Sequence, residues 1–596
     1  MPSRDRKNGL TAGLIKKNKG LFIGASLSAL ISALADMLSP LLLAEMVDHV
    51  FKGQPSRLPF AVTHAYETLS GGQVPNEVAV LALATVLVSV ISGTFSFLKA
   101  RLQASMGEGT ARDLRFRLYD RLQRLPYAYH VKAQTGDLIQ HCTSDVDTVR
   151  RFLAVQLMSV ISSLVTIVIA VSYLVSAHIP LTLYSLVLVP GLFLFAWLFM
   201  KWVIARFEET DVAEGAMSAV LQEGITGVRV VRSFGRQMFE EERFRKASAA
   251  FRDKSMSTGK LMAMYWAVTD MLSSAQCLIT LVMCAVYAAR GEITVGTAIV
   301  FTTYVSRMLW PIRQLGRILA DGGKASVALK RMKEILDTPP EEDEPGETPD
   351  LRGDIVFDHV TFGYDGDKPV LKDFTVTLPG GATVGILGPT GSGKSTLALL
   401  LQRLYDYDRG EITISGVPLR HIQKDYLRRH VGLILQEPFL YSMSLEDNLK
   451  AAVPGIGTQE ALEAARDAQA EEFILNSENG LDTLVGERGV TLSGGQKQRM
   501  AIARTLLKDD HILIFDDSLS AVDARTDIAV RKALKKHRDG TTTLIISHRI
   551  STLMEADLIL VIENGQVSQL GTHEELIRTD GLYRRIYDIQ ANITQA

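Results

Sequence analysis

The sequence predicts two domains of different class: an all-α membrane domain with six transmembrane helices and, after it, an α/β domain. Three observations favour this division. Long apolar runs occur only in the first half of the 596 residues, an acidic, proline-containing stretch follows them, and β-rich runs then alternate with helical ones. We therefore expect a transmembrane domain over residues 1–322, a linker over residues 323–350 and an α/β domain over residues 351–596.

The first half contains apolar stretches long enough to cross a bilayer, which takes about 20 residues. The predicted spans are Leu21–Val47, Val78–Leu98, Phe152–Ser176, Leu181–Val203, Leu261–Ala289 and Thr297–Leu319. Two carboxylates, Asp36 and Asp270, fall within the first and fifth spans. Charged groups inside a membrane are costly and usually face a cavity, so they hint at a cationic cargo, with packing between helices as the alternative.

Basic residues orient these spans. They are frequent before the first span (Arg4, Arg6, Lys7, Lys16, Lys17 and Lys19), between spans two and three, and between spans four and five. Because cytoplasmic loops carry the excess of Lys and Arg, all three segments are expected in the cytoplasm, and an even number of spans returns the second half there. Helical spacing in Thr110–Leu125 and Asp211–Gln222 predicts that the helices continue past the bilayer.

Composition excludes some classes of protein. The net charge of −2 argues against a nucleic-acid partner. Three cysteines, Cys142, Cys277 and Cys284, give no disulfide framework. The run Thr338–Gly346 combines prolines with like charges, which indicates an interdomain boundary.

A glycine-rich string in the second half fits the phosphate-binding P-loop pattern. It reads Gly388-Pro389-Thr390-Gly391-Ser392-Gly393-Lys394-Ser395, with Thr396 next. Val384–Leu387 predicts a buried strand before the loop, and Ser395–Leu404 predicts a helix after it, which is the context that the motif requires. We expect Lys394 to reach the β- and γ-phosphates of ATP and Ser395 to ligate Mg²⁺.

A second string resembles the signature of ATP-binding-cassette (ABC) ATPases, and the resemblance covers nearly the whole chain. The string is Leu492-Ser493-Gly494-Gly495-Gln496. The resemblance implies that Ser493, Gly494, Gly495 and Gln496 contact an ATP held by a different cassette. It therefore implies that the chain hydrolyses ATP only as a dimer. Val485–Gly489 resembles a segment of ABC exporters, which favours an exporter over an importer.

The same resemblance assigns roles to other residues. Asp516, at the end of the apolar run Ile512–Asp516, looks like the Walker B aspartate and implies Mg²⁺ binding together with Ser395 and Gln436. Gln436 in the Q-loop and His548 in the switch loop are implied to sense the γ-phosphate. Asp523 resembles the D-loop aspartate after Ser520-Ala521-Val522. Tyr364 is implied to stack on adenine, the alternative being a core tyrosine at a strand edge.

One position departs from the family pattern. The residue after the Walker B aspartate is usually Glu, which polarises the attacking water, and here it is Asp517. Its carboxylate is withdrawn by about 1.5 Å, one C–C bond, and a general base must reach its proton. With Lys394, Gln436 and His548, Asp517 completes the expected catalytic set. In the family, Asp at this position is typical of one half of a heterodimer.

Two cytoplasmic turns also resemble the exporter family. They are Thr135–Leu138 with Asp145–Asp147, and Gly227–Gly235. In the family such loops carry short coupling helices that dock on the ATPase domain, and ordinary polar turns are the alternative.

The sequence thus predicts half of an ATP-driven exporter in the plasma membrane. It would pair with a second ABC half-transporter, contact membrane lipids and move small amphipathic compounds. The alternatives are a homodimeric lipid or peptide translocase and an ATP-gated channel.

Overall fold

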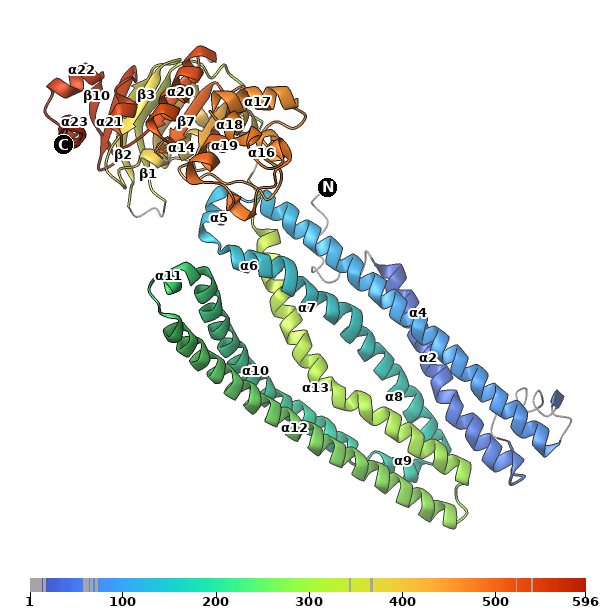
Figure 1. Ribbon diagram of the computed structural model, residues 1–596. Coiled ribbons are helices and arrows are strands. Elements are labelled where there is room, and N and C mark those ends of the chain that lie inside the picture. Colours follow the sequence, from blue (N-terminus) through green and yellow to red (C-terminus); the bar gives the residue numbers. More distant parts are fainter. Residues whose placement is uncertain are drawn as a thin grey trace. The chain divides into compact units, whose positions relative to one another are not determined.

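The computed structural model describes residues 13, 18–56, 64, 68–69, 73–341, 345–364, 368–520, 522–537 and 540–595. The chain forms two compact units (Figure 1). The membrane unit comprises Met1–Arg124 and Ala133–Pro339, and the ATPase-like unit comprises Leu125–Lys132 and Pro340–Ala596. The basic residues Arg4, Arg6, Lys7, Lys16 and Lys17, the linker acids Glu342, Asp343 and Glu344, and Ala521 lie outside the described residues.

Helices make up the membrane unit. They are α2 (Lys19–Glu45), α4 (Val74–Gln123), α6 (Thr135–Gln140), α7 (Val146–Arg151), α8 (Leu157–Ala177), α9 (Ile179–Ser185), α10 (Val189–Thr226), α11 (Val228–Ser233), α12 (Gln237–Ala289) and α13 (Val295–Asp337). Three π-helical turns, Met46–Val50, His141–Asp145 and Phe152–Gln156, continue or join them. Helix α13 lies between the α10–α12 pair and α8 (Figure 1) and contacts all three.

Within the described residues, five helical stretches are long and apolar enough to cross a membrane. They are Lys19–Val50, Val74–Gln123, Thr135–Ala177, Ile179–Thr226 and Gln237–Ala289. The sixth predicted span, Thr297–Leu319, lies in α13, which is not among the five. Arg307, Arg313 and Arg317 interrupt its apolar residues. The count of six spans is therefore not confirmed, although Val300, Phe301 and Val305 of α13 are buried in the core of the unit.

The apolar run of the fourth stretch suggested one continuous helix, but the structure has a break there. Helix α9 ends at Ser185 and α10 begins at Val189, with Pro190 in its first turn. A proline is tolerated at a helix start because that position needs no N–H. The buried Gln276 of α12 fills the break. Its Oε1 accepts from the Leu188 N–H at 2.8 Å and its Nε2 donates to the Tyr184 carbonyl at 3.0 Å.

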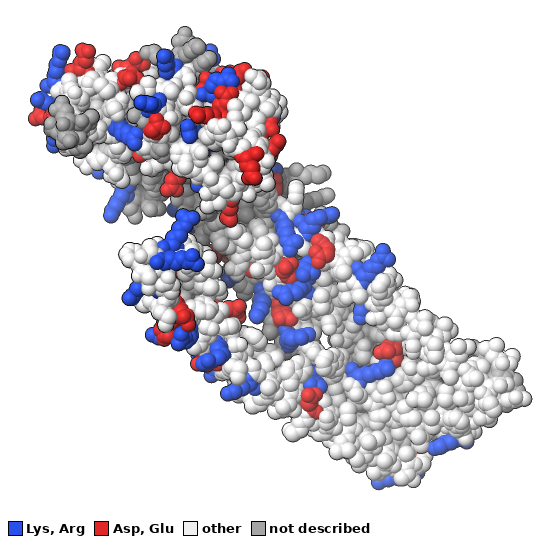
Figure 2. Space-filling model, viewed as in Figure 1, with Lys and Arg blue, Asp and Glu red and all other residues white. Residues whose placement is uncertain are grey.

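The long helices extend well beyond a bilayer, as the helical spacing predicted. Helix α4 has 50 residues and α12 has 53, so each is about 75–80 Å long at 1.5 Å per residue. The hydrocarbon core of a bilayer is only about 30 Å thick. On the face shown in Figure 2, charged residues are dense toward α6 and α11 and sparse toward α9. On this face, the apolar surface of the unit therefore lies toward α9.

The ATPase-like unit contains two sheets. One has the order β2-β1-β4-β5 and is antiparallel, and the other has the order β10-β9-β3-β8-β7-β6. In the six-stranded sheet every neighbouring pair is parallel except β10 with β9. The strands are β1 (Ile355–Phe362), β2 (Leu371–Leu378), β3 (Thr383–Leu387), β4 (Arg409–Ile414), β5 (Val417–Pro418), β6 (Val431–Ile434), β7 (Ile512–Asp516), β8 (Thr542–Ile546), β9 (Leu558–Glu563) and β10 (Gln566–Gly571).

Helices surround these sheets (Figure 1). They are α5 (Tyr127–Lys132), α14 (Lys394–Leu401), α15 (Lys424–His430), α16 (Leu445–Lys450), α17 (Thr458–Asp467), α18 (Glu471–Leu475), α19 (Gly494–Leu506), α20 (Ala524–His537), α21 (Ile550–Leu553), α22 (His573–Arg578) and α23 (Leu582–Gln595), with short 3₁₀ turns at Leu419–His421, Gly480–Asp482 and Glu487–Gly489. The run Ile512–Phe515 is completely buried. Continuous apolar runs are typical of parallel strands covered on both faces.

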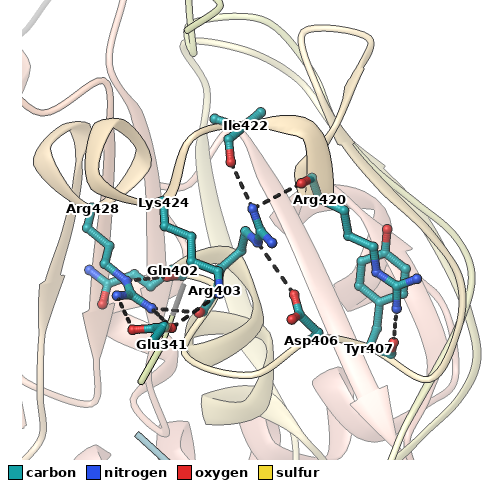
Figure 3. Close-up of polar contacts among 9 residues, drawn as sticks. All are labelled: Glu341, Gln402, Arg403, Asp406, Tyr407, Arg420, Ile422, Lys424 and Arg428. Atoms are coloured by element: carbon teal, nitrogen blue, oxygen red, sulfur yellow. Dashed lines mark hydrogen bonds and ion pairs between the residues drawn. The ribbon is translucent and has the colours of Figure 1, made fainter. Parts of the chain in front are cut away.

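Glu341, which follows α13 in the sequence, forms ion pairs within the ATPase-like unit (Figure 3). Arg428 donates to both carboxylate oxygens of Glu341 at 2.8 Å, and Lys424 lies 3.5 Å away. Burial alone would raise the pKa of Glu341, but the hydrogen bonds and charges of Arg428 and Lys424 outweigh it and lower that pKa. Farther on, the Glu347 N–H donates to the His421 carbonyl at 2.8 Å.

Candidate nucleotide-binding site

The predicted ATP residues converge because their strands are neighbours in one sheet. Strands β3, β8, β7 and β6 are adjacent and parallel, so their carboxyl ends lie at one edge. The P-loop follows β3, His548 follows β8, Asp516 ends β7 and Gln436 follows β6. Open α/β sheets bind ligands at this edge. Residues scattered over more than 160 positions of the sequence therefore meet in one place.

The P-loop has the backbone that its glycines predict. Gly391 and Gly393 have φ of +82° and +104°, a region that glycine enters without strain. A Cβ at Gly388 would lie 2.4 Å from the Ile562 carbonyl oxygen, so glycine is required there. The buried Lys394 begins α14, and its Nζ donates to the Gly388 and Pro389 carbonyls at 2.8 and 2.9 Å. Burial lowers the pKa of Lys394, opposed by Asp516 and Asp517.

The residues around the loop fit Mg²⁺ and ATP. Ser395 Oγ donates to Asp516 Oδ1 at 2.9 Å, so two of the three predicted magnesium ligands are in contact. Ser392 Oγ is buried and has no hydrogen-bond partner among the described residues, and the N-terminus of α14 favours a phosphate. Burial raises the pKa of Asp516, and the Ser395 hydroxyl opposes this effect. One carboxylate, one hydroxyl and phosphate oxygens are a typical ligand set for Mg²⁺.

Asp517 is held in an unusual backbone conformation. Its φ is +47°, a left-handed value that Asp tolerates better than most residues. Its N–H donates to the Ile546 carbonyl of β8 at 2.9 Å. Gln436 Nε2 donates to Asp517 Oδ2 at 3.2 Å, while Oδ1 is buried without a partner among the described residues. Gln436 and Asp517 are thus brought together, with one carboxylate oxygen left unused.

The loop that carries His548 is tied to the D-loop. Arg549 donates to the Ser520 and Val522 carbonyls at 2.8 and 3.3 Å. The His548 side chain itself is exposed. Asp523 accepts from the Thr526 N–H at 3.0 Å and from the Thr526 hydroxyl at 2.8 Å, so within one chain it caps α20. The Thr526 backbone and hydroxyl hydrogen bonds lower the pKa of Asp523.

The signature segment is a helix start. Ser493 caps α19: its Oγ accepts from the Gln496 N–H, and Gln496 Oε1 accepts from the Ser493 N–H. This reciprocal capping satisfies two N–H groups of the first turn. Of the next two residues, Gly494 is exposed and Gly495 is half-buried. The segment therefore presents a helix N-terminus and glycine backbone to a ligand.

Tyr364 lies beside the P-loop helix. Its hydroxyl is 3.0 Å from Thr396 Oγ1, and its side chain is 41% exposed. The edges of Phe362 and Tyr405 contact its ring at centroid distances of 5.1 Å. A tyrosine buried in the core would not leave this much surface free, so this exposure favours the adenine-stacking role over the alternative.

Sequence reasoning missed two groups of residues near the site. The first is the short helix α5, Tyr127–Lys132, which precedes the Thr135–Leu138 turn at the start of α6. Tyr127 packs edge-on against Tyr405 at 5.6 Å, and Tyr405 packs against Tyr364. Pro126 before the aromatic run was a signal that could have located this helix. The second group is in α23, which contacts the His548 loop through Gln590.

Comparisons with known families agree with this geometry. Residues 22–312 match the family described as "ABC transporter transmembrane region", and residues 371–520 match the family described as "ABC transporter".

Relatives match along most of the chain. A Bacillus subtilis (strain 168) protein named "Uncharacterized ABC transporter ATP-binding protein YknU" is 34% identical over 518 residues, 86% of this chain and 88% of its own length. Another from that organism, "Probable multidrug resistance ABC transporter ATP-binding/permease protein YheI", is 35% identical over 81% of this chain and 83% of its own length. A solved structure titled "Structure of a bacterial Atm1-family ABC exporter with ATP bound" aligns with a TM-score of 0.83 and 27% identity, covering 96% of this chain and 99% of that one.

Proposed function

The chain belongs to the ABC transporter family, as an ATP-driven exporter, and we propose that it is one half of a heterodimer that moves amphipathic compounds out of the cytoplasm or the inner leaflet. The observation that carries this proposal is the shared sheet edge. Lys394, Ser395, Asp516 and His548 lie at that edge. Among the described residues, the Ser493 Oγ and N–H bond only to Gln496, and the Ser493 carbonyl accepts from the Lys497 N–H of the same helix. The signature is thus free to contact the ATP of a partner cassette.

Asp517 supports the heterodimer. Its carboxylate is one methylene shorter than that of Glu, its backbone is left-handed, and Gln436 donates to its Oδ2, while Oδ1 has no partner among the described residues. A base that reaches the attacking water poorly would make this site slow. The intact signature would complete the faster site of the partner.

The proposed placement is a plasma membrane, with the N-terminus and the ATPase domain in the cytoplasm and α13 as a sixth span. Arginine-rich segments between the second and third spans, and between the fourth and fifth, support this orientation. Two arginines of α13 are paired with carboxylates: Arg307 Nη1 lies 3.0 Å from Asp36 Oδ2, and Arg313 Nη2 lies 2.6 Å from Asp270 Oδ1. Pairing reduces the cost of placing charges in a bilayer.

These ion pairs weaken the argument for a cationic cargo. The suggestion of a cationic compound assumed that Asp36 and Asp270 were free to attract it. Each carboxylate already has an arginine partner, and Arg313 also lies over the Trp266 and Trp310 rings, at 5.2 and 5.7 Å. We therefore propose an amphipathic cargo without a required positive charge. The names of relatives such as YheI, which mention multidrug resistance, support this substrate class.

The test is transport by purified protein in sealed vesicles, with and without a partner half-transporter. We expect ATP-dependent accumulation of cationic, neutral and anionic amphipathic dyes against their gradients. Accumulation by the chain alone would contradict the heterodimer. ATP-dependent single-channel current without accumulation would contradict the pump and favour a channel.

A further inference from the structure

A side chain of the last described helix reaches the loop that carries His548. Gln590 of α23 donates from Nε2 to the His548 carbonyl at 2.8 Å and accepts at Oε1 from the Ile550 N–H at 2.9 Å. One amide therefore clamps two backbone groups on either side of Arg549. The donor and acceptor assignment follows from the partners, because a carbonyl only accepts and an N–H only donates.

The clamp is mounted on a docked helix. Near the start of α23, Tyr583 is completely buried, and its hydroxyl lies 2.7 Å from His573 Nδ1. The Tyr583 N–H also donates to Gln569 Oε1 at 3.2 Å. Ile586 and Tyr587, one turn later, pack on the same core. Gln590 therefore acts from a fixed position.

The His548 loop is held on its other sides as well. The Ser547 N–H donates to the Ile386 carbonyl of β3 at 3.2 Å, and Arg549 binds the D-loop carbonyls. Ile550 is buried. The exposed imidazole of His548 is thus carried on a short backbone segment whose carbonyl, and whose N–H two residues later, both depend on Gln590.

We propose that Gln590 is a positioning residue for ATP hydrolysis, which holds the backbone of His548 so that its imidazole points to the γ-phosphate. The inference rests on the proposed role of His548. A displacement of about 1 Å in a catalytic group can lower the rate by up to about 100-fold. Loss of the two Gln590 hydrogen bonds should therefore lower the hydrolysis rate measurably.

Three substitutions separate the clamp from general packing. Gln590→Met keeps the length and removes both hydrogen bonds. Gln590→Glu keeps an acceptor for the Ile550 N–H but loses the donor to the His548 carbonyl. Ile589→Ala is the matched control, because the Ile589 side chain is 60% exposed on the same helix.

The experiment uses the purified full-length chain, paired where turnover requires it with a partner half-transporter whose own general-base carboxylate has been neutralised. The measured kcat is then that of the site built on this chain's P-loop and His548. We expect kcat for ATP to fall about 10-fold in Gln590→Met, less in Gln590→Glu and not at all in Ile589→Ala, with KM nearly unchanged. Hydrogen exchange at the Ile550 amide should rise in Gln590→Met. In a His548→Ala background Gln590→Met should add no further loss of kcat, since it acts through that histidine.

The outcomes separate the inference from the proposed function. If His548→Ala lowers turnover and Gln590→Met does not, the positioning role is wrong while the role of His548 stands. If His548→Ala leaves turnover unchanged, the role of His548 is wrong and the positioning role falls with it. Unchanged exchange at Ile550 in Gln590→Met, or equal and additive losses in both backgrounds, would also overturn the inference.

Discussion

The ATP site and the charged groups of the membrane unit differ in what determines their surroundings. At the ATP site each residue sits in a short local motif at the end of a strand, and the sheet brings the motifs together. In the membrane unit, three polar side chains depend on residues of another helix or of a break between helices: Asp36 on Arg307, Asp270 on Arg313, and Gln276 on the break before Leu188.

The difference shows where a motif is informative. A glycine-rich loop has the same backbone and the same phosphate-binding N–H groups wherever it occurs. An aspartate in a membrane helix has no such local context, and a partner more than 40 residues away decides whether its charge is free. Substitutions in both regions test this contrast.

Ser493→Arg should abolish transport and reduce ATPase activity at least about 100-fold, the order of a lost transition-state donor. The guanidinium would occupy the place where the γ-phosphate held by the partner docks. The measurement is steady-state ATPase of the purified dimer. Ser493→Ala removes the helix cap of α19 but keeps the space, so it controls for stability. Normal turnover in Ser493→Arg would show that the signature does not act on a partner site.

Lys394→Ala should weaken ATP binding at this chain's own site by about 10- to 100-fold, because it removes a charged hydrogen-bond donor. Binding of a fluorescent ATP analogue measures the loss, and Lys394→Arg tests whether charge alone suffices. In a heterodimer, substantial ATPase should remain. Complete loss of hydrolysis would instead indicate two equivalent sites.

Asp517→Glu should raise ATPase activity little if the partner's signature is degraded. If the chain forms a homodimer, activity should rise about 10-fold or more, within the range of a well-placed general base. The left-handed backbone at position 517 disfavours Glu, so thermal unfolding is measured alongside. Asp517→Asn has the same shape but no basic carboxylate, so it gives the ATPase rate in the absence of a general base. Robust hydrolysis by the chain alone, strongly raised by Glu, would contradict the heterodimer.

Asp270→Asn should lower the free energy of unfolding by about 1–2 kcal/mol, because Arg313, only 10% exposed, loses its ion partner. Asp36→Asn should cost less, since Arg307 is 33% exposed. Thermal unfolding in detergent measures both. The double variant Asp270→Asn/Arg313→Gln should recover part of the loss. If only the efflux of cationic dyes fell and stability were unchanged, the result would support a role for these carboxylates in attracting cations.

Glu341→Gln should destabilise the chain by about 1 kcal/mol at pH 7 through loss of the charged hydrogen bonds from Arg428. The folded-state pKa of Glu341 lies below the unfolded value of about 4.3. The contribution is therefore complete above about pH 4.3 and is lost as the pH falls through the folded-state pKa. The free energy of unfolding of the variant should be lower than that of the wild type at pH 7, and this difference should disappear in acid. Glu574→Gln, at an exposed position of α22, is the control, and a difference that persists in acid would assign the effect to packing.

Most of the arrangement of the candidate ATP site could be predicted from the sequence, and much less of the membrane unit's polar pairing. Gly391, Lys394 and Asp516 were identified because strand, loop and helix signals follow one another directly. Gln590 was not identified, since a lone glutamine in a helix has no pattern until β8 places His548 beside it. The sixth span is not confirmed for a related reason: arginines lower the hydropathy of α13, and their pairing with carboxylates of other helices cannot be read from the sequence.

The position of β3 has a consequence for how the chain folds. Thr383 pairs with Thr543, and Val384 pairs with Leu558, so the strand before the P-loop lies between two strands from much later in the sequence. Contacts this distant form slowly, because a long loop must close before they contribute. Folding intermediates that lack β8 and β9 should hold no ordered P-loop. ATP would then bind, and so stabilise, only chains whose sheet is complete. A high ATP concentration should therefore favour fully folded chains over such intermediates.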